Sequence, residues 1–184
     1  MRRLLLGMYS AGLLAGCSSV QAPVAKSELP AKYAVSGRVA VQAHGKGYPA
    51  ARFEWKHDNT AEQVDLSNPL GQVVARLELS SNAARYTDSN GQLHEAADIE
   101  TLTERALGWR LPAEGLRYWL LGLAAPGREA HWSRSETGKV LEQDGWQIRY
   151  KGLDGSMPDG LTLSRPELEI RILLSDWQLA YAQP

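Results

Sequence analysis

Hydrophobic and polar side chains alternate one by one along most of the chain from Tyr33 onward. The clearest stretch is 168–174, where leucine and isoleucine occupy every second position. Such alternation is typical of antiparallel strands that bury one face and expose the other, and Gly, Asn, Asp and Pro clusters between the stretches predict turns. We predict about ten strands. The main alternating stretches are 33–42, 51–56, 63–67, 73–80, 146–151, 161–163, 168–174 and 177–181.

The spacing of hydrophobic residues becomes helical between Asp98 and Gly122. Asp98 is a suitable N-cap for a first helix, and Gly108 ends that helix. Pro112 suits the first turn of a second helix, which we expect to stop at Gly122. The expected hydrophobic faces consist of Ile99, Leu102 and Ala106 in the first helix and Leu116, Trp119 and Leu120 in the second.

The order of these elements predicts a mainly β (α+β) fold. The two helices interrupt the strands in mid-chain instead of alternating with them, which favours an antiparallel sheet with both helices on one face. A sheet with this many strands curls, because strands twist and flat exposed edges are unfavourable. A curled sheet roofed by two short helices can leave an apolar space between them.

The first sixteen residues have the features of a secretory signal. Arg2 and Arg3 precede a largely apolar run over 4–14, which is too short to span a bilayer. Leu14-Ala15-Gly16-Cys17 resembles a bacterial lipobox, which implies cleavage after residue 16 and a lipidated Cys17. The alternative is an ordinary signal peptide followed by a free cysteine. We therefore divide the chain into a signal peptide at 1–16, a lipidated N-terminus and flexible tether at 17–32, and a body at 33–184.

Residue 18 indicates the membrane to which the protein is anchored. In lipoproteins of Gram-negative bacteria, aspartate after the lipidated cysteine commonly signals retention at the inner membrane. Ser18 occupies that position here, so the resemblance implies the periplasmic face of the outer membrane. Ser, Pro and Ala dominate residues 18–32, and this composition is typical of an extended spacer.

Composition and motifs exclude several classes of function. Removal of Arg2 and Arg3 leaves 18 Lys and Arg against 21 Asp and Glu, a formal charge of −3, which does not suggest nucleic-acid binding. A single cysteine allows no internal disulfide. The four histidines lack the local spacing of a zinc site, and neither a phosphate-binding loop nor a nucleophile elbow is present. We expect no metal, no cofactor and no enzymatic activity.

Six tryptophans and a single phenylalanine make up an unusual aromatic set. Most of the tryptophans fall on the hydrophobic side of their element, so the simplest interpretation is a packed core. Together with neighbouring leucines they are also suited to line an apolar cavity for acyl chains. The candidate cavity residues are Phe53, Trp55, Leu66, Trp109, Leu116, Trp119, Leu120, Trp146 and Ile148.

A leucine stands at the tip of the turn Asn68-Pro69-Leu70-Gly71. Pro69 fixes φ for a turn, and Gly71 tolerates positive φ. Leu70 either folds back onto its own sheet or stays exposed as a tip that touches a membrane or a cargo molecule.

Five motifs in order resemble the LolB family of outer-membrane lipoprotein receptors over about residues 33–177. The motifs are Phe53-Glu54-Trp55, Asn68-Pro69-Leu70-Gly71-Gln72, Leu107-Gly108-Trp109-Arg110-Leu111-Pro112, Trp119-Leu120-Leu121-Gly122-Leu123 and Gly145-Trp146-Gln147-Ile148-Arg149-Tyr150. The resemblance implies a half-open antiparallel barrel with a helical lid and an apolar cavity. It also implies a monomer that accepts acylated lipoproteins from the periplasmic carrier LolA and inserts them into the inner leaflet of the outer membrane without nucleotide. The family's membrane-insertion leucine corresponds to Leu70, framed by Asn68, Pro69 and Gly71.

Two other functions remain open at this point. One is a structural or assembly lipoprotein that binds partners of an envelope machine through a sheet edge or a flat patch. The other is a lipid hydrolase, for which the sequence offers no pair of nucleophile and base.

Overall fold

A computed structural model of the chain describes residues 29–58, 60–80, 83–153 and 157–180. The predicted signal peptide, Cys17 and the tether up to residue 28 lie outside these residues. Within the described residues, no helix is both long enough and hydrophobic enough to cross a membrane.

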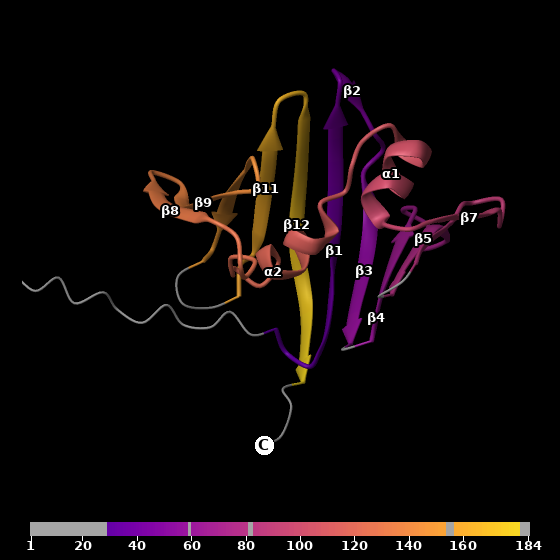
Figure 1. Cartoon of the computed structure of the whole chain (residues 1–184), viewed down its shortest axis with the longest axis horizontal. Coiled ribbons are helices and arrows are strands. Elements are labelled where there is room, and N and C mark those ends of the chain that lie inside the picture. The colour runs from indigo at the N-terminus through magenta and orange to yellow at the C-terminus, as the bar shows by residue number, and fades with distance from the viewer. Residues whose placement is uncertain (1–28, 59, 81–82, 154–156, 181–184) are drawn as a thin grey trace, which may run out of the picture.

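Twelve strands form one antiparallel sheet (Figure 1). The strands are β1 (Lys32–Ala43), β2 (Lys46–Gly47), β3 (Ala51–Asp58), β4 (Ala61–Ser67), β5 (Val73–Ser80), β6 (Ala84–Thr87), β7 (Leu93–Ala96), β8 (Ala130–Ser135), β9 (Gly138–Gln143), β10 (Trp146–Lys151), β11 (Gly160–Arg165) and β12 (Leu168–Ala180). The spatial order is β7-β6-β5-β4-β3-β1-β12-β11-β10-β9-β8, with the short β2 paired to β1. In the described residues β7 and β8 do not pair with each other, so the sheet is not closed into a barrel. The predicted antiparallel fold is confirmed.

The central pair β1 and β12 joins the two halves of the chain. Their register runs from Lys32 opposite Ala180 to Ala43 opposite Leu168, with an irregularity after Val35. The alternation predicted for 168–174 is present, because the side chains at 168, 170 and 172 are buried. Strand β12 continues past the irregularity, so the alternating stretch from 177 belongs to the same strand as 168–174. A Cβ at Gly37 would lie 2.0 Å from the carbonyl oxygen of Leu173, so only glycine fits there.

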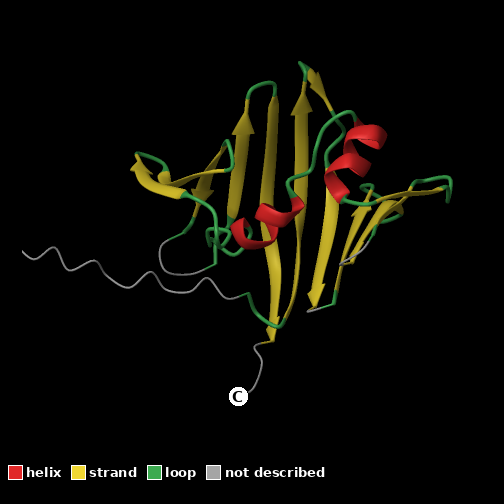
Figure 2. Ribbon diagram, in the orientation of Figure 1, coloured by secondary structure: helices red, strands yellow, loops and turns green. Residues whose placement is uncertain are grey.

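Both helices cover the same face of the sheet (Figure 2). Helix α1 (Ile99–Leu107) begins after Asp98, whose side chain accepts from the Thr101 N–H, and it ends at Gly108 in the left-handed conformation. Both predicted ends of α1 are confirmed. Helix α2 (Ala113–Trp119) follows Pro112 as predicted but ends at Trp119, short of the expected stop at Gly122. The chain reaches Gly122 through tight turns, because the N–H groups of residues 121 and 122 bond to carbonyls only three residues back.

The sequence analysis missed five short strands: β2, which has only two residues, and β6, β7, β8 and β9. Strand β8 is exposed along nearly its whole length, so its sequence carries no alternation. Strands β6 and β7 have four residues each, too few to establish a period of two. In β9 Val140 and Leu141 are both buried, which breaks the alternation.

Candidate functional site

The interior between the sheet and the two helices contains all nine candidate cavity residues. Seven are buried in one hydrophobic cluster: Phe53, Trp55, Leu116, Trp119, Leu120, Trp146 and Ile148. Leu66 and Trp109 are partly buried and pack against that cluster. Trp119, Leu120 and Ile148 have no accessible surface, so side chains fill the centre of this interior. The sequence pattern thus identified residues that share one interior, while their role as walls of an acyl-chain cavity stays a prediction.

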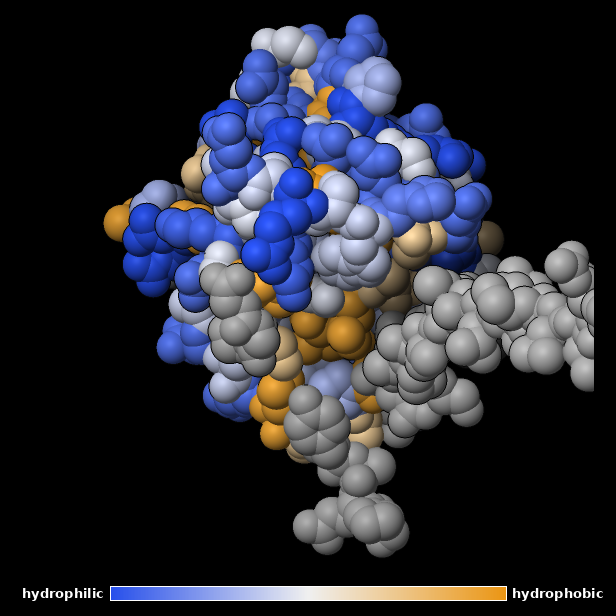
Figure 3. Space-filling model, turned by 90° about the vertical axis from the view of Figure 1, so that its left-hand side faces the viewer, coloured by the Kyte–Doolittle hydropathy of each residue, from blue (hydrophilic) through white to orange (hydrophobic). Residues whose placement is uncertain are grey.

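The hydrophobic interior reaches the molecular surface at its edge. Partly buried hydrophobic residues surround the buried cluster, among them Leu123, Leu153 and Trp177. On the side of the molecule seen in Figure 3, hydrophobic residues gather below a largely hydrophilic upper part. This edge is where an apolar molecule would first meet the hydrophobic interior.

Helix α2 is attached to the sheet through Gln143, a buried residue at the end of β9. The Gln143 Oε1 accepts from Trp119 Nε1 at 2.9 Å and from the Ala125 N–H at 2.8 Å. The Gln143 Nε2 donates to the Ala125 carbonyl at 2.9 Å. The indole of Trp119 also packs against its own helix, where a Cβ on Gly115 would lie 2.4 Å from the ring. One glutamine therefore fixes both α2 and the chain that leaves it.

The connection between α1 and α2 is held by Thr103 and Tyr48. The Thr103 hydroxyl, which is buried, donates to the Ile99 carbonyl at 2.9 Å and accepts from the Leu111 N–H at 2.9 Å. The Tyr48 hydroxyl donates to the Leu107 carbonyl at 2.9 Å. Each contact joins a helix end to a neighbouring segment through a single side chain.

A buried polar cluster lies beneath α2, at the end of the sheet where β1 begins. Glu62 Oε1 lies 3.1 Å from Arg117 Nε and 3.0 Å from His57 Nδ1. The Tyr33 hydroxyl donates to the Arg117 carbonyl at 3.3 Å, and the Tyr33 ring stacks on His57. Burial, and next the nearby Glu62 carboxylate, raise the pKa of Tyr33 far above its ordinary value. The cluster ties α2 to β1, β3 and β4.

Apart from Arg117 Nε, which lies against the Glu62 carboxylate, three buried donors of the described chain have no hydrogen-bond partner: Trp55 Nε1, Trp109 Nε1 and the Tyr150 hydroxyl. Burial raises the pKa of Tyr150, so this group stays a protonated donor. Buried polar groups are normally paired in folded proteins. These donors are chemically suited to the carbonyl oxygens of an ester or an amide.

The turn between β4 and β5 holds Leu70 away from the protein. The Asn68 Oδ1 accepts from the Leu70 N–H at 2.9 Å and from the Gln72 N–H at 3.1 Å. The Gly71 N–H donates to the Asn68 carbonyl at 2.9 Å, and Gly71 has a φ of 84°. Leu70 is 85% exposed, the largest value among the exposed large hydrophobic residues of the described chain. Of the two predicted arrangements, the exposed tip is the one observed.

Sequence reasoning did not select Gln143, Glu62 or Arg117. A usable signal existed for Glu62. It has the same parity as Val64 and Leu66 in its strand, so alternation directs its side chain inward, whereas β9 has no regular alternation that could have placed Gln143. In the described parts of the chain, no group of three or more His, Cys, Asp and Glu side chains is arranged to hold a metal ion.

Comparison with known proteins gives consistent matches. The family model described as "Outer membrane lipoprotein LolB" matches residues 31–177. The outer-membrane lipoprotein LolB of Chromobacterium violaceum is 35% identical over 184 residues, covering 96% of this chain and 99% of that protein. LolB of Bordetella petrii is 38% identical over 189 residues, covering 97% and 92%. A crystal structure of a DUF1329 family protein from Desulfovibrio piger has a TM-score of 0.52 at 7% identity, covering 86% of this chain and 89% of that one, which is a likeness of fold alone.

Proposed function

The chain belongs to the LolB family of outer-membrane lipoproteins, and we propose that it accepts acylated lipoproteins from the periplasmic carrier LolA and inserts them into the inner leaflet of the outer membrane. In this proposal the lipidated Cys17 anchors the protein to the membrane, and the tether lets the body reach both carrier and bilayer. No covalent chemistry and no nucleotide are required.

The energetics of acyl chains explain why such a receptor is needed. Exposing a lipid chain to water costs about 0.8 kcal/mol per CH₂, so a triacylated protein has to pass directly from one apolar surface to another. The interior of this protein has the required chemistry, with tryptophan and leucine side chains between a sheet and two short helices. Transfer then follows increasing burial, from carrier to receptor and finally to the bilayer.

Acyl chains can enter only if the filled interior opens, and we assign this opening to α2. The helix has seven residues, and its polar attachments come from Gln143 and the cluster around Glu62. An outward shift of α2 would uncover the indole of Trp119 and the wall beneath it. The unpaired donors Trp55, Trp109 and Tyr150 would then be available to the ester and amide carbonyls of the bound lipid.

The observation that carries the insertion step is the exposure of Leu70. A leucine that is 85% exposed on a turn ordered by Asn68 gains nothing from the fold, because its side chain is not buried. At a membrane the same side chain would be transferred from water into the lipid interface. The turn keeps it in position for that contact.

The test is a transfer assay with carrier-bound acylated lipoprotein and membrane vesicles. Leu70→Glu should accept cargo normally but insert it poorly, because a carboxylate at the tip opposes entry into lipid. Leu93→Glu is the matched control, since Leu93 is 54% exposed on β7, which is separated from β5 by β6. Normal insertion by Leu70→Glu, or equal defects in both variants, would refute the role of the tip.

The anchor can be tested separately. The chain from residue 17 onward with Cys17→Ala retains every residue that the structure describes. It should still take an acylated peptide from the carrier, because the interior lies in the body. Failure to accept any acylated peptide would contradict this division between anchor and receptor.

A second candidate function rests on the edges of the sheet. Strands β7 and β8 end it on either side in the described chain, and they carry the exposed Leu93 and Trp132. Free edges of this kind can bind a partner strand, as an assembly lipoprotein would require. Displacement of a hydrophobic fluorescent probe by a triacylated peptide favours the receptor, and absence of probe binding favours the assembly role.

A further inference from the structure

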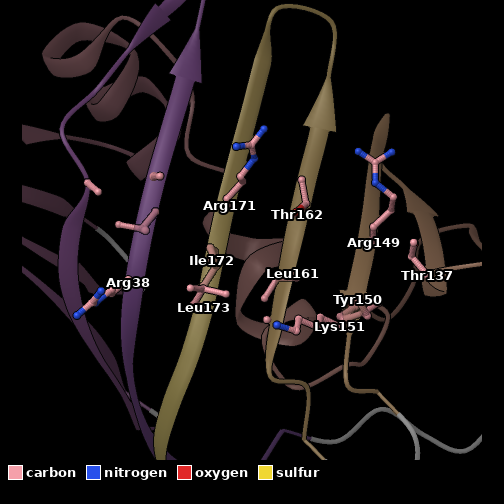
Figure 4. Close-up of a pocket in the computed structure, with 14 residues that line it drawn as sticks. Arg38, Thr137, Arg149, Tyr150, Lys151, Leu161, Thr162, Arg171, Ile172 and Leu173 are labelled. Carbon is pink, nitrogen blue, oxygen red and sulfur yellow. The ribbon is translucent and has the colours of Figure 1, made fainter.

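The outer face of the sheet, opposite the helices, carries two successive rows of side chains across its central strands. Register places Ala40, Arg171, Thr162 and Arg149 in one row, and Arg38, Leu173, Gly160 and Lys151 in the next. The residues between these two rows, which include Ile172, Leu161 and Tyr150, direct their side chains to the opposite face, where they are buried on the helix side. Cationic side chains from β1, β10 and β12 therefore share the outer face (Figure 4).

These cations surround a shallow depression of about 540 Å³. It is lined by fourteen residues, none of which is an aspartate or a glutamate. Arg38 and Lys151 make no ion pair in the described chain, and Arg149 donates only to the neutral Gln147 side chain, at 2.7 Å. The surface therefore carries a local excess of positive charge.

Acidic side chains border this surface. Glu169 Oε1 lies 2.6 Å from Arg171 Nη2, and Glu54, Asp65 and Asp176 line the neighbouring depression to which Arg38 and Leu173 also contribute. Farther along the same face, Arg76 is paired with Asp65 and Lys56 is paired with Glu54. The positive excess is thus concentrated on the central strands, although the mature chain as a whole is predicted to be slightly acidic.

An exposed hydrophobic side chain lies among these cations. Leu173 is 54% exposed, and it lines a second depression that also contains Arg38, Gly71 and Val73. Gly71 and Val73 belong to the turn and strand that follow Leu70. Leu70, Val73 and Leu173 are three of the five large hydrophobic residues that are exposed in the described chain. A continuous surface therefore leads from the Leu70 tip to the cations.

We propose that this outer face, defined by Arg38, Arg149, Lys151, Arg171 and Leu173, docks on the anionic phosphate groups of a membrane surface. Docking would bring the Leu70 tip against the bilayer, so the proposal rests on the insertion role proposed above and adds the surface that orients it. A broad array of cations with a hydrophobic centre matches a lipid interface, which offers phosphates above and acyl chains below. Each cation near an anionic membrane is worth about fivefold in binding.

The test is co-sedimentation of the chain from residue 17 onward, with Cys17→Ala, on phosphatidylcholine vesicles with and without phosphatidylglycerol. Binding should be stronger with phosphatidylglycerol and should fall as salt is added. The double variant Arg38→Gln/Lys151→Gln should bind the anionic vesicles about 25-fold more weakly, because two cationic charges are lost. The matched control is Arg105→Gln/Arg134→Gln, which removes two exposed arginines from α1 and β8 and should change binding little.

Equal binding of the unmodified surface to both kinds of vesicle would overturn the proposal, as would equal losses in the two double variants. Unchanged vesicle binding with weaker binding to the carrier would also overturn it, because the surface would then serve an acidic protein. Binding of a triacylated peptide is measured in parallel. If that binding persists while the vesicle result fails, only the docking surface is wrong; if the peptide does not bind at all, the receptor function itself fails.

Discussion

Replacement of Gln143 by leucine should destabilise the protein more than any surface change, because one side chain carries three buried hydrogen bonds. The variant leaves Trp119 Nε1 and both backbone groups of Ala125 without partners, and both residues are buried. An unpaired buried group costs about 1–3 kcal/mol. Leucine keeps much of the volume of glutamine, so the loss arises mainly from these three groups and amounts to about 3–9 kcal/mol.

This loss is large compared with a total stability of about 5–15 kcal/mol for a domain. Urea unfolding measures it directly. With a slope of about 2 kcal/mol per molar, the midpoint should fall by about 1.5–4.5 M. Gln178→Leu is the control, because Gln178 is exposed on β12, and its midpoint should move by less than the equivalent of about 0.5 kcal/mol.

The double variant Gln143→Leu/Trp119→Phe distinguishes the loss of hydrogen bonds from a poor fit of the leucine side chain. Trp119→Phe removes the indole N–H, so in the Gln143→Leu background one unpaired donor disappears. The loss of stability in the double variant should therefore be smaller than the sum of the losses in the two single variants. A destabilisation by Gln143→Leu below about 1 kcal/mol, or strict additivity of the two changes, would refute the reasoning.

Three further predictions follow from local geometry. Gly115→Ala should destabilise α2 by about 1–3 kcal/mol in thermal unfolding, because the added Cβ would lie 2.4 Å from an indole ring; equal or higher stability would show that the ring moves freely. Arg117→Met should cost about 3 kcal/mol by leaving the buried Glu62 carboxylate without its cation, and the double change with Glu62→Met should recover most of it; no recovery would contradict the pairing. Hydrogen bonds from the Thr60 hydroxyl and backbone lower the pKa of Asp58 to about 2. The Asp58 carboxylate therefore stabilises the fold above its ordinary pKa, and this stabilisation is lost as the pH falls toward 2. An NMR titration midpoint of Asp58 near 4, unchanged by Thr60→Val, would refute this.

Strands and helices were predicted correctly from the sequence wherever the hydrophobic periodicity extended over enough residues. The alternation at 168–174 and the caps Asp98 and Gly108 predicted their elements correctly, because in each case a local rule and the tertiary contact agree. The end of α2 was wrong, since Gly122 closes a series of turns rather than the helix itself. The exposed strand β8 carried no hydrophobic pattern, because neither of its faces is buried for most of its length.

The candidate site was predictable in its composition but not in its polar contacts. Hydrophobic side chains on one side of an element tend to meet in one interior, and the nine predicted residues do so. The pairing of Glu62 with Arg117 and the triple contact of Gln143 depend on segments that are distant in sequence, so local patterns could not identify them. The basic outer face was likewise invisible, because its cations come from β1, β10 and β12 and are brought into register only by the sheet.

Location of a bound acyl chain tests the receptor function most directly. A triacylated peptide with a photoreactive diazirine near the end of one chain can be cross-linked to the protein and mapped by mass spectrometry. We predict adducts on residues of the interior, such as Trp119, Trp146 and Ile148, with none on the outer-face residues Arg149 and Arg171. Adducts confined to the outer face, or to the sheet edges at β7 and β8, would contradict an interior that receives lipid.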